Sequence, residues 1–94
     1  MSATTYLTRK EELDYDITTR SSTIRETIIW DCDGSDFAIS ITPYLNDNLS
    51  GELDLEELEQ LAEAEELPEL TALVGEERKR DNLDSTDYEL AISY

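Results

Sequence analysis

Hydrophobic and polar residues alternate along the N-terminal part of the chain with the period of two residues that a half-buried β-strand shows. The alternating hydrophobic residues are Leu13, Tyr15 and Ile17 in a first segment, Ile24, Ile28, Trp30 and Cys32 in a second, and Phe37, Ile39 and Ile41 in a third. Residues 33–35, Asp-Gly-Ser, form a tight-turn signal between the second and third segments. We therefore expect a β-hairpin there, because its cross-strand pairs are then all apolar: Cys32–Phe37, Trp30–Ile39 and Ile28–Ile41.

The hydrophobic spacing changes to that of an α-helix after Pro43, which ends the third strand because proline cannot donate a hydrogen bond within a sheet. Residues 46–51 are mostly polar and predict a loop. Asp54 and Glu57 then have the spacing of a capping box, in which two side chains satisfy free backbone amides at a helix start. The apolar stripe of this main helix consists of Leu55, Leu58, Leu61 and Ala62.

A second short helix is expected from Pro68, which suits a first helical turn, to Gly75. Residues 76–87 show no periodic pattern and predict a loop. The last segment alternates like a strand, with the hydrophobic residues Tyr88, Leu90, Ile92 and Tyr94. A chain of 94 residues has room for one modest core. We predict one α+β domain spanning residues 1–94: an antiparallel sheet of about four strands, with the main helix and the second short helix on one face, in β-β-β-α-α-β order.

The charge of the chain is strongly unbalanced, with 24 acidic residues, seven basic residues and a formal net charge of −17. Such a field repels nucleic acid and anionic membranes and attracts basic protein surfaces. No apolar run, including residues 72–74, is longer than three residues, and the N-terminus lacks the basic and apolar stretches of a secretory signal, so we expect a soluble, cytoplasmic protein. Because Cys32 is the only cysteine, the chain cannot form an internal disulfide.

The carboxylates of the main helix stand in a row with no lysine or arginine among them, since no basic residue occurs between Arg25 and Arg78. Like charges three or four residues apart on a helix destabilise it by a few tenths of a kcal/mol per pair, and their Cβ atoms are about 5–6 Å apart. A rigid row of this kind can occupy a groove that is built for phosphates. The predicted partner-binding residues are Glu56, Glu59, Glu63 and Glu66 on the helix, and Asp31, Asp33 and Asp36 at the predicted hairpin tip.

In composition, size and lack of catalytic residues, the chain resembles the small acidic phage-encoded anti-CRISPR and anti-restriction proteins that mimic DNA. The resemblance extends over the whole chain and involves no sequence motif. It implies a non-enzymatic inhibitor of phage or viral origin, acting in the host cytoplasm. Its partner would be a basic nucleic-acid-binding protein, such as a CRISPR effector, a restriction enzyme or another nuclease, and it would bind neither nucleic acid nor membrane itself.

Adaptation to high salt is an alternative interpretation of the same composition. Proteins of salt-loving organisms also combine many acidic residues with few lysines, and Lys10 and Lys79 are the only lysines here. In that case the carboxylates form a solvated coat and carry no information about a partner. The two interpretations are compatible, as in a virus of a halophile.

Residues 46–57 provide a second alternative, because they resemble the twelve-residue calcium loop of an EF-hand. The resemblance implies side-chain ligands from Asn46, Asn48, Ser50, Asp54 and Glu57, and a backbone carbonyl ligand from Glu52. Two departures are Asn46 in place of the usual aspartate and a strand-like segment with Pro43 where an entering helix is expected. A loop followed by a capped helix explains the same residues.

Enzymatic activity is not expected. The chain has no histidine for a Ser-His-Asp or Cys-His nucleophile, and its three glycines leave no phosphate-binding loop. Apart from calcium in the EF-hand-like case, we expect no cofactor.

Overall fold

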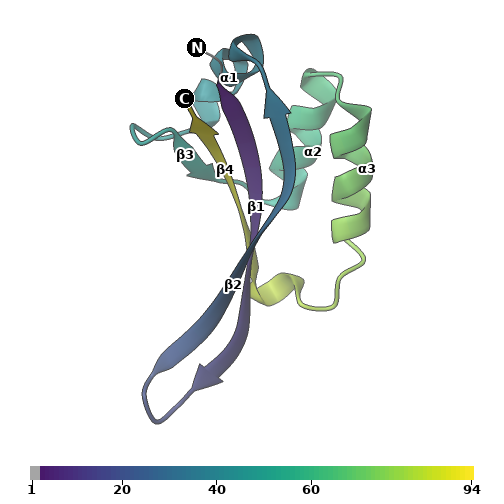
Figure 1. The fold of residues 1–94 in the computed structure, drawn as a ribbon. Helices are drawn as coiled ribbons and strands as arrows, with labels where there is room; N and C mark the ends of the chain where they lie inside the picture. Colours follow the sequence, from purple (N-terminus) through teal and green to yellow (C-terminus); the bar gives the residue numbers. More distant parts are fainter. Residues whose placement is uncertain (1–2) are drawn as a thin grey trace.

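The computed structural model describes residues 3–94, apart from the side chains of residues 14 and 15. Its elements are β1 (Thr4–Asp16), β2 (Ser21–Asp33), α1 (Ser35–Ile41), η1 (Thr42–Tyr44), β3 (Ser50–Glu52), α2 (Leu55–Ala64), α3 (Pro68–Glu77), η2 (Leu83–Ser85) and β4 (Thr86–Ser93). The strands form one antiparallel sheet in the order β2-β1-β4-β3, and α2 and α3 lie on one side of it (Figure 1). The predicted α+β class is therefore confirmed. No helix in residues 3–94 has the length and apolar character needed to cross a membrane.

β1 and β2 form a long hairpin that extends beyond the rest of the sheet (Figure 1). β4 pairs with β1 only between Thr4 and Glu11, so residues 12–24 project as a two-stranded arm. Asp16 closes its turn, since its Oδ1 atom accepts a hydrogen bond from the Thr18 amide at 2.8 Å. A two-stranded ribbon is marginally stable alone in water, so the arm depends on the sheet at its base.

The predicted hairpin between residues 28–32 and 37–41 is wrong. β2 pairs with β1 instead, with Trp30 opposite Leu7, and residues 35–41 form α1. Gly34 has a φ of 134°, a left-handed value that favours glycine and lets the chain turn from β2 into the helix. Ala38 and Ile41 are three residues apart, which suits one face of a helix, and both are buried.

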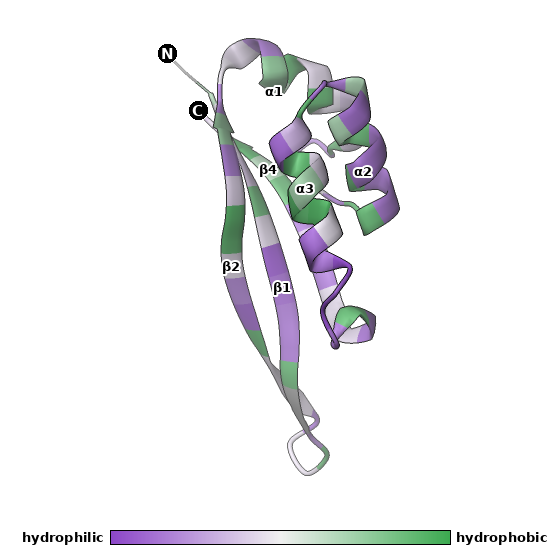
Figure 2. Cartoon of the chain, turned by 90° about the vertical axis from the view of Figure 1, so that its right-hand side faces the viewer, coloured by the Kyte–Doolittle hydropathy of each residue, from purple (hydrophilic) through white to green (hydrophobic). Residues whose placement is uncertain are grey.

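The core lies between the sheet and the helices. Alternate residues of β4 are buried on the helix side, and Leu90 in the middle of the strand is fully buried. α2 and α3 cover them with side chains that include Leu58, Leu61 and Leu70. Burying a leucine side chain contributes about 1.5–3 kcal/mol. The outer side of α2 is mostly hydrophilic (Figure 2), so its carboxylates face away from this core.

Candidate partner-binding surface

α2 has the local structure that its sequence predicts. Asp54 caps its N-terminus, with Oδ1 accepting from the Glu57 amide at 2.7 Å, while Glu57 Oε1 accepts from the Asp54 amide at 3.2 Å. Leu58, Leu61 and Ala62 are buried against the sheet. Since the apolar stripe occupies one side, Glu56 and Glu63 are exposed on the other.

The predicted row of four carboxylates on α2 is corrected at two positions. Arg78 Nη2 donates to Glu59 Oε2 at 3.1 Å, so this carboxylate is paired with a cation from beyond α3. Glu66 lies after the end of α2 and has a φ of 54°, so it continues no helical face. Glu56 lies in the first turn of the helix and Glu63 lies near its other end. The helix alone therefore carries no continuous phosphate-like row.

α1, the end of β2 and the turn between α2 and α3 lie at one end of the molecule (Figures 1 and 2), and each of these parts, like the first turn of α3, carries exposed acidic residues. The predicted hairpin tip does not exist, but β2 and α1 still bring three aspartates to this end. We call these six exposed residues the acidic end: Asp31, Asp33, Asp36, Glu63, Glu66 and Glu69. It includes five of the seven predicted partner-binding residues. Glu69, in the first turn of α3, is a member that the sequence analysis missed.

The basic residues lie outside the acidic end, and most of them form ion pairs there. Among the side chains that the structure describes, six of the seven are in ion pairs, and none of these pairs involves the acidic end: Arg9, Arg25 and Arg80 pair with Glu11 or Glu77, Lys10 with Glu26 and Glu89, Arg78 with Glu59, and Lys79 with Glu76. The seventh, Arg20, lies in the turn of the projecting arm. The cations therefore lie toward the middle of the sheet, the C-terminal end of α3 and the arm, and leave the acidic end uncompensated.

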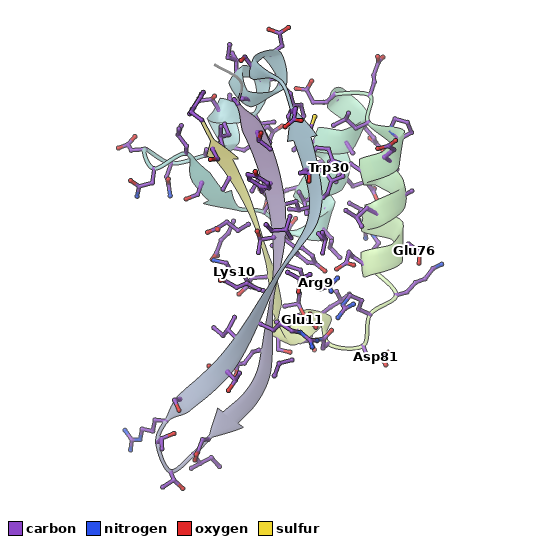
Figure 3. The ribbon with its side chains drawn as sticks, in the orientation of Figure 1. Arg9, Lys10, Glu11, Trp30, Glu76 and Asp81 are labelled. Atoms are coloured by element: carbon purple, nitrogen blue, oxygen red, sulfur yellow. The ribbon has the colours of Figure 1, made fainter. Side chains whose placement is uncertain are left out.

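A pocket of about 310 Å³ opens within the acidic end, between β2 and the start of α3. It is lined by Trp30, Asp31, Cys32, Leu67, Pro68 and Glu69. Figure 3 shows Trp30 between β2 and α3, above Arg9 and Glu11 in this view. Burial raises the pKa of the Cys32 thiol, and the negative charges of Asp33, Asp31 and Glu69 raise it further. Negative potential from β2 and α3 thus converges on this pocket.

The EF-hand-like segment is folded as a turn, a short strand and a helix cap. Asn46 Oδ1 accepts from the Asn48 amide at 2.8 Å, and Ser50 and Glu52 lie in β3, paired with Ala91 and Glu89 of β4. Asp54 and Glu57 bind each other's amides in the capping box. In the described part of the chain, no three His, Cys, Asp or Glu side chains are grouped to hold a metal ion.

Calcium binding by residues 46–57 stays a prediction. Titration calorimetry of the protein and of Glu57→Gln at millimolar calcium tests it. If the site binds calcium, the unmodified protein should give a heat of binding and the variant should not.

Comparison with known proteins finds no matching family model, no similar curated protein and no similar solved structure.

Proposed function

We propose that the protein is a non-enzymatic inhibitor whose acidic end occupies the positively charged nucleic-acid-binding cleft of another protein. The proposed partner is a host defence complex, such as a CRISPR effector, a restriction enzyme or another nuclease. The single observation that carries this proposal is the acidic end, where six exposed carboxylates from β2, α1, α3 and the segment 63–66 lie without an ion-pairing cation among the described residues.

The charge arrangement suits such a partner for two reasons. Neighbouring carboxylates repel each other, so a surface of this kind is stabilised when a basic surface covers it. In addition, a net charge of −17 accelerates the diffusional encounter with a basic cleft, and this effect falls as salt screens the charges. Together these effects favour fast, salt-dependent binding to a basic partner.

The supporting scaffold is rigid where the carboxylates sit. Asp31 and Asp33 end a strand paired with β1, and Thr4 Oγ1 donates to Asp33 Oδ1 at 2.7 Å. Glu66 and Leu67 form a hydrogen-bonded helix end, in which the Leu67 amide donates to the Ala62 carbonyl at 2.8 Å. Preorganised charges lose less conformational entropy on binding than charges on a flexible tail.

The test compares two triple variants with the same change in net charge. Asp36→Lys/Glu63→Lys/Glu66→Lys reverses charges at the acidic end, and Asp47→Lys/Asp81→Lys/Asp84→Lys reverses exposed charges in turns and in η2 elsewhere. Each protein is assayed against a panel of purified CRISPR effectors, restriction endonucleases and non-specific nucleases, by cleavage and by displacement of a fluorescent duplex oligonucleotide.

We expect the unmodified protein to displace the oligonucleotide from at least one enzyme of the panel. The acidic-end variant should bind at least about tenfold more weakly than the loop variant, a difference of about 1.4 kcal/mol. Equal losses in the two variants would mean that net charge alone matters. That result, or a lack of displacement across the panel, would contradict the proposal.

A further inference from the structure

The pocket within the acidic end combines an apolar lining with two carboxylates at its edge. Trp30, Leu67 and Pro68 line it together with Asp31 and Glu69. We propose that it holds an arginine side chain of the basic partner, with the apolar stem against the lining and the guanidinium beside the carboxylates. This inference rests on the proposed function and names the residue type that the surface recognises.

The apolar walls of the pocket are fixed by contacts outside it. Trp30 packs edge to face against Phe37, with ring centroids 5.7 Å apart and an interplanar angle of 75°. The Leu67 amide donates to the Ala62 carbonyl at 2.8 Å, and the Leu67 carbonyl accepts from the Thr71 amide at 3.1 Å. Pro68, in the first turn of α3, has a φ that its ring restricts. The lining is therefore preorganised for an incoming side chain.

Charge complementarity selects the occupant. Asp31 and Glu69 are exposed, and within residues 3–94 neither takes part in an ion pair. No basic residue lines the pocket. An apolar or acidic occupant would remove water from these carboxylates without replacing its hydrogen bonds, which is unfavourable. A cationic side chain can replace the lost water by binding both carboxylates.

The size and the aromatic wall favour arginine over other cations. A volume of about 310 Å³ lies at the lower limit for ligand pockets, so it suits one long side chain. Arginine presents several N–H donors in a plane that can bind carboxylates at two points, and its guanidinium interacts favourably with a tryptophan ring. Lysine offers a compact, more strongly hydrated charge.

Trp30 provides the measurement, because it is the only tryptophan of the chain and it lines the pocket. The probes are three blocked tripeptides, Gly-X-Gly, in which X is arginine, lysine or citrulline; citrulline keeps the shape of arginine without its charge. Binding is followed by tryptophan fluorescence and by the NMR shift of the indole N–H. We expect saturable binding of the arginine peptide, binding of the lysine peptide that is weaker by about threefold or more, and no response to citrulline.

Matched variants locate the site. Glu69→Gln should weaken arginine-peptide binding by about fivefold. Glu76→Gln makes the same change in charge on the same helix, at the end distant from Trp30 (Figure 3), and should bind like the unmodified protein. Both positions are exposed, so both variants are expected to fold, and far-ultraviolet circular dichroism checks this. Equal affinities for the arginine and citrulline peptides, or for the two variants, would overturn the arginine pocket.

The outcomes separate this inference from the proposed function. If the pocket fails these tests while the acidic-end triple variant still loses inhibition, nucleic-acid mimicry stands without an arginine anchor. If the pocket passes while that triple variant inhibits as well as its control, the pocket stands and mimicry falls.

Discussion

Arg80 and Glu11 are 69 residues apart in the sequence, yet Arg80 Nη2 donates a hydrogen bond to Glu11 Oε2 at 2.6 Å. Glu11 is only 1% exposed and also accepts from Arg9 Nε at 3.0 Å. Arg9 Nη1 also donates to Glu77 Oε2 at 2.9 Å, and the Tyr88 hydroxyl donates to Glu77 Oε1 at 2.8 Å. This ion cluster of Arg9, Glu11, Glu77, Arg80 and Tyr88 joins β1, α3 and β4, so two of the seven basic residues help hold the layers together.

Glu77→Gln should lower the free energy of unfolding by about 3 kcal/mol, because it leaves Arg9 and Arg80 without one of their two buried countercharges. Urea unfolding followed by circular dichroism measures the change. Glu76→Gln is the control, since its side chain is exposed and should change stability by less than about 0.5 kcal/mol. Similar values for the two variants would contradict the structural role of the cluster.

The contribution of Glu11 should depend on pH. Hydrogen bonds from Asn82, Arg9 and Arg80 lower the pKa of Glu11 from 4.5 to about 2. A lowered pKa in the folded state stabilises the protein above the ordinary pKa, and this stabilisation is lost as the pH falls from 4.5 to about 2. The stability difference between the unmodified protein and Glu11→Gln should be largest near pH 6 and shrink toward pH 2.

Urea unfolding of both proteins between pH 6 and pH 2 checks this. Both share the other carboxylates, so the effect of protonating those groups cancels in the difference. A difference that stays constant over this range would show that ionised Glu11 has no special role.

Gly51 and Gly75 should respond to alanine in opposite directions. A Cβ atom at Gly51 would collide with the Tyr44 carbonyl oxygen, whereas one at Gly75 meets no atom within 4 Å. Gly51→Ala should therefore cost at least about 2 kcal/mol by displacing β3, and Gly75→Ala should stabilise α3 by about 1 kcal/mol. Thermal unfolding of the two variants measures both changes, and a neutral Gly51→Ala would contradict the close approach of β3 to Tyr44.

Glu66→Gly should raise the free energy of unfolding by about 1 kcal/mol. Glu66 has a φ of 54° at the end of α2, a conformation in which a side chain is unfavourable and glycine is not. The substitution also removes a negative charge from the negative end of the helix dipole. Glu63→Gly is the contrast, since it lies within the helix and should destabilise by about 1 kcal/mol. If urea unfolding shows that Glu66→Gly does not raise the free energy of unfolding, this account is contradicted.

Sodium chloride should stabilise the protein without being required for folding. The screening length falls from about 10 Å at 0.1 M to 3 Å at 1 M salt, which weakens repulsion among the exposed carboxylates while the buried ion cluster is screened less. We expect a folded protein at 0.1 M and a melting temperature that rises by several degrees at 1 M. Glu63→Gln/Glu66→Gln should show a smaller rise. A protein that folds only in molar salt would favour the high-salt interpretation of its composition.

Local patterns in the sequence were sufficient for α2, α3 and β4. The capping box of Asp54 and Glu57, the leucine spacing of α2 and the alternation from Tyr88 to Ile92 are set within a few residues. Each element forms where it is expected, although α2 ends at Ala64 and α3 continues to Glu77. The α+β class follows from these elements because an apolar strand face and an apolar helix stripe must bury each other.

The pairing of the strands was decided only in three dimensions. Alternation identifies Trp30 as part of a strand, but it does not identify Leu7 of β1 as its partner. Residues 37–41 satisfy the period of a strand through Phe37, Ile39 and Ile41, and that of a helix through Ala38 and Ile41. In the fold, β2 pairs with β1, and residues 35–41 form a helix that buries Ala38 and Ile41 and leaves Ile39 68% exposed.

The same distinction applies to the charges. The chain shows by itself that residues 26–77 contain no lysine or arginine, so some acidic surface had to remain uncompensated. Only the fold decides that Glu11 and Glu77 are buried with arginines, that Arg78 reaches Glu59, and that Glu69 joins Asp31 at the acidic end. Ion pairs and pockets bring together residues that are distant in the chain. Packing and desolvation select these residues, and the local periodicity of the sequence does not predict them.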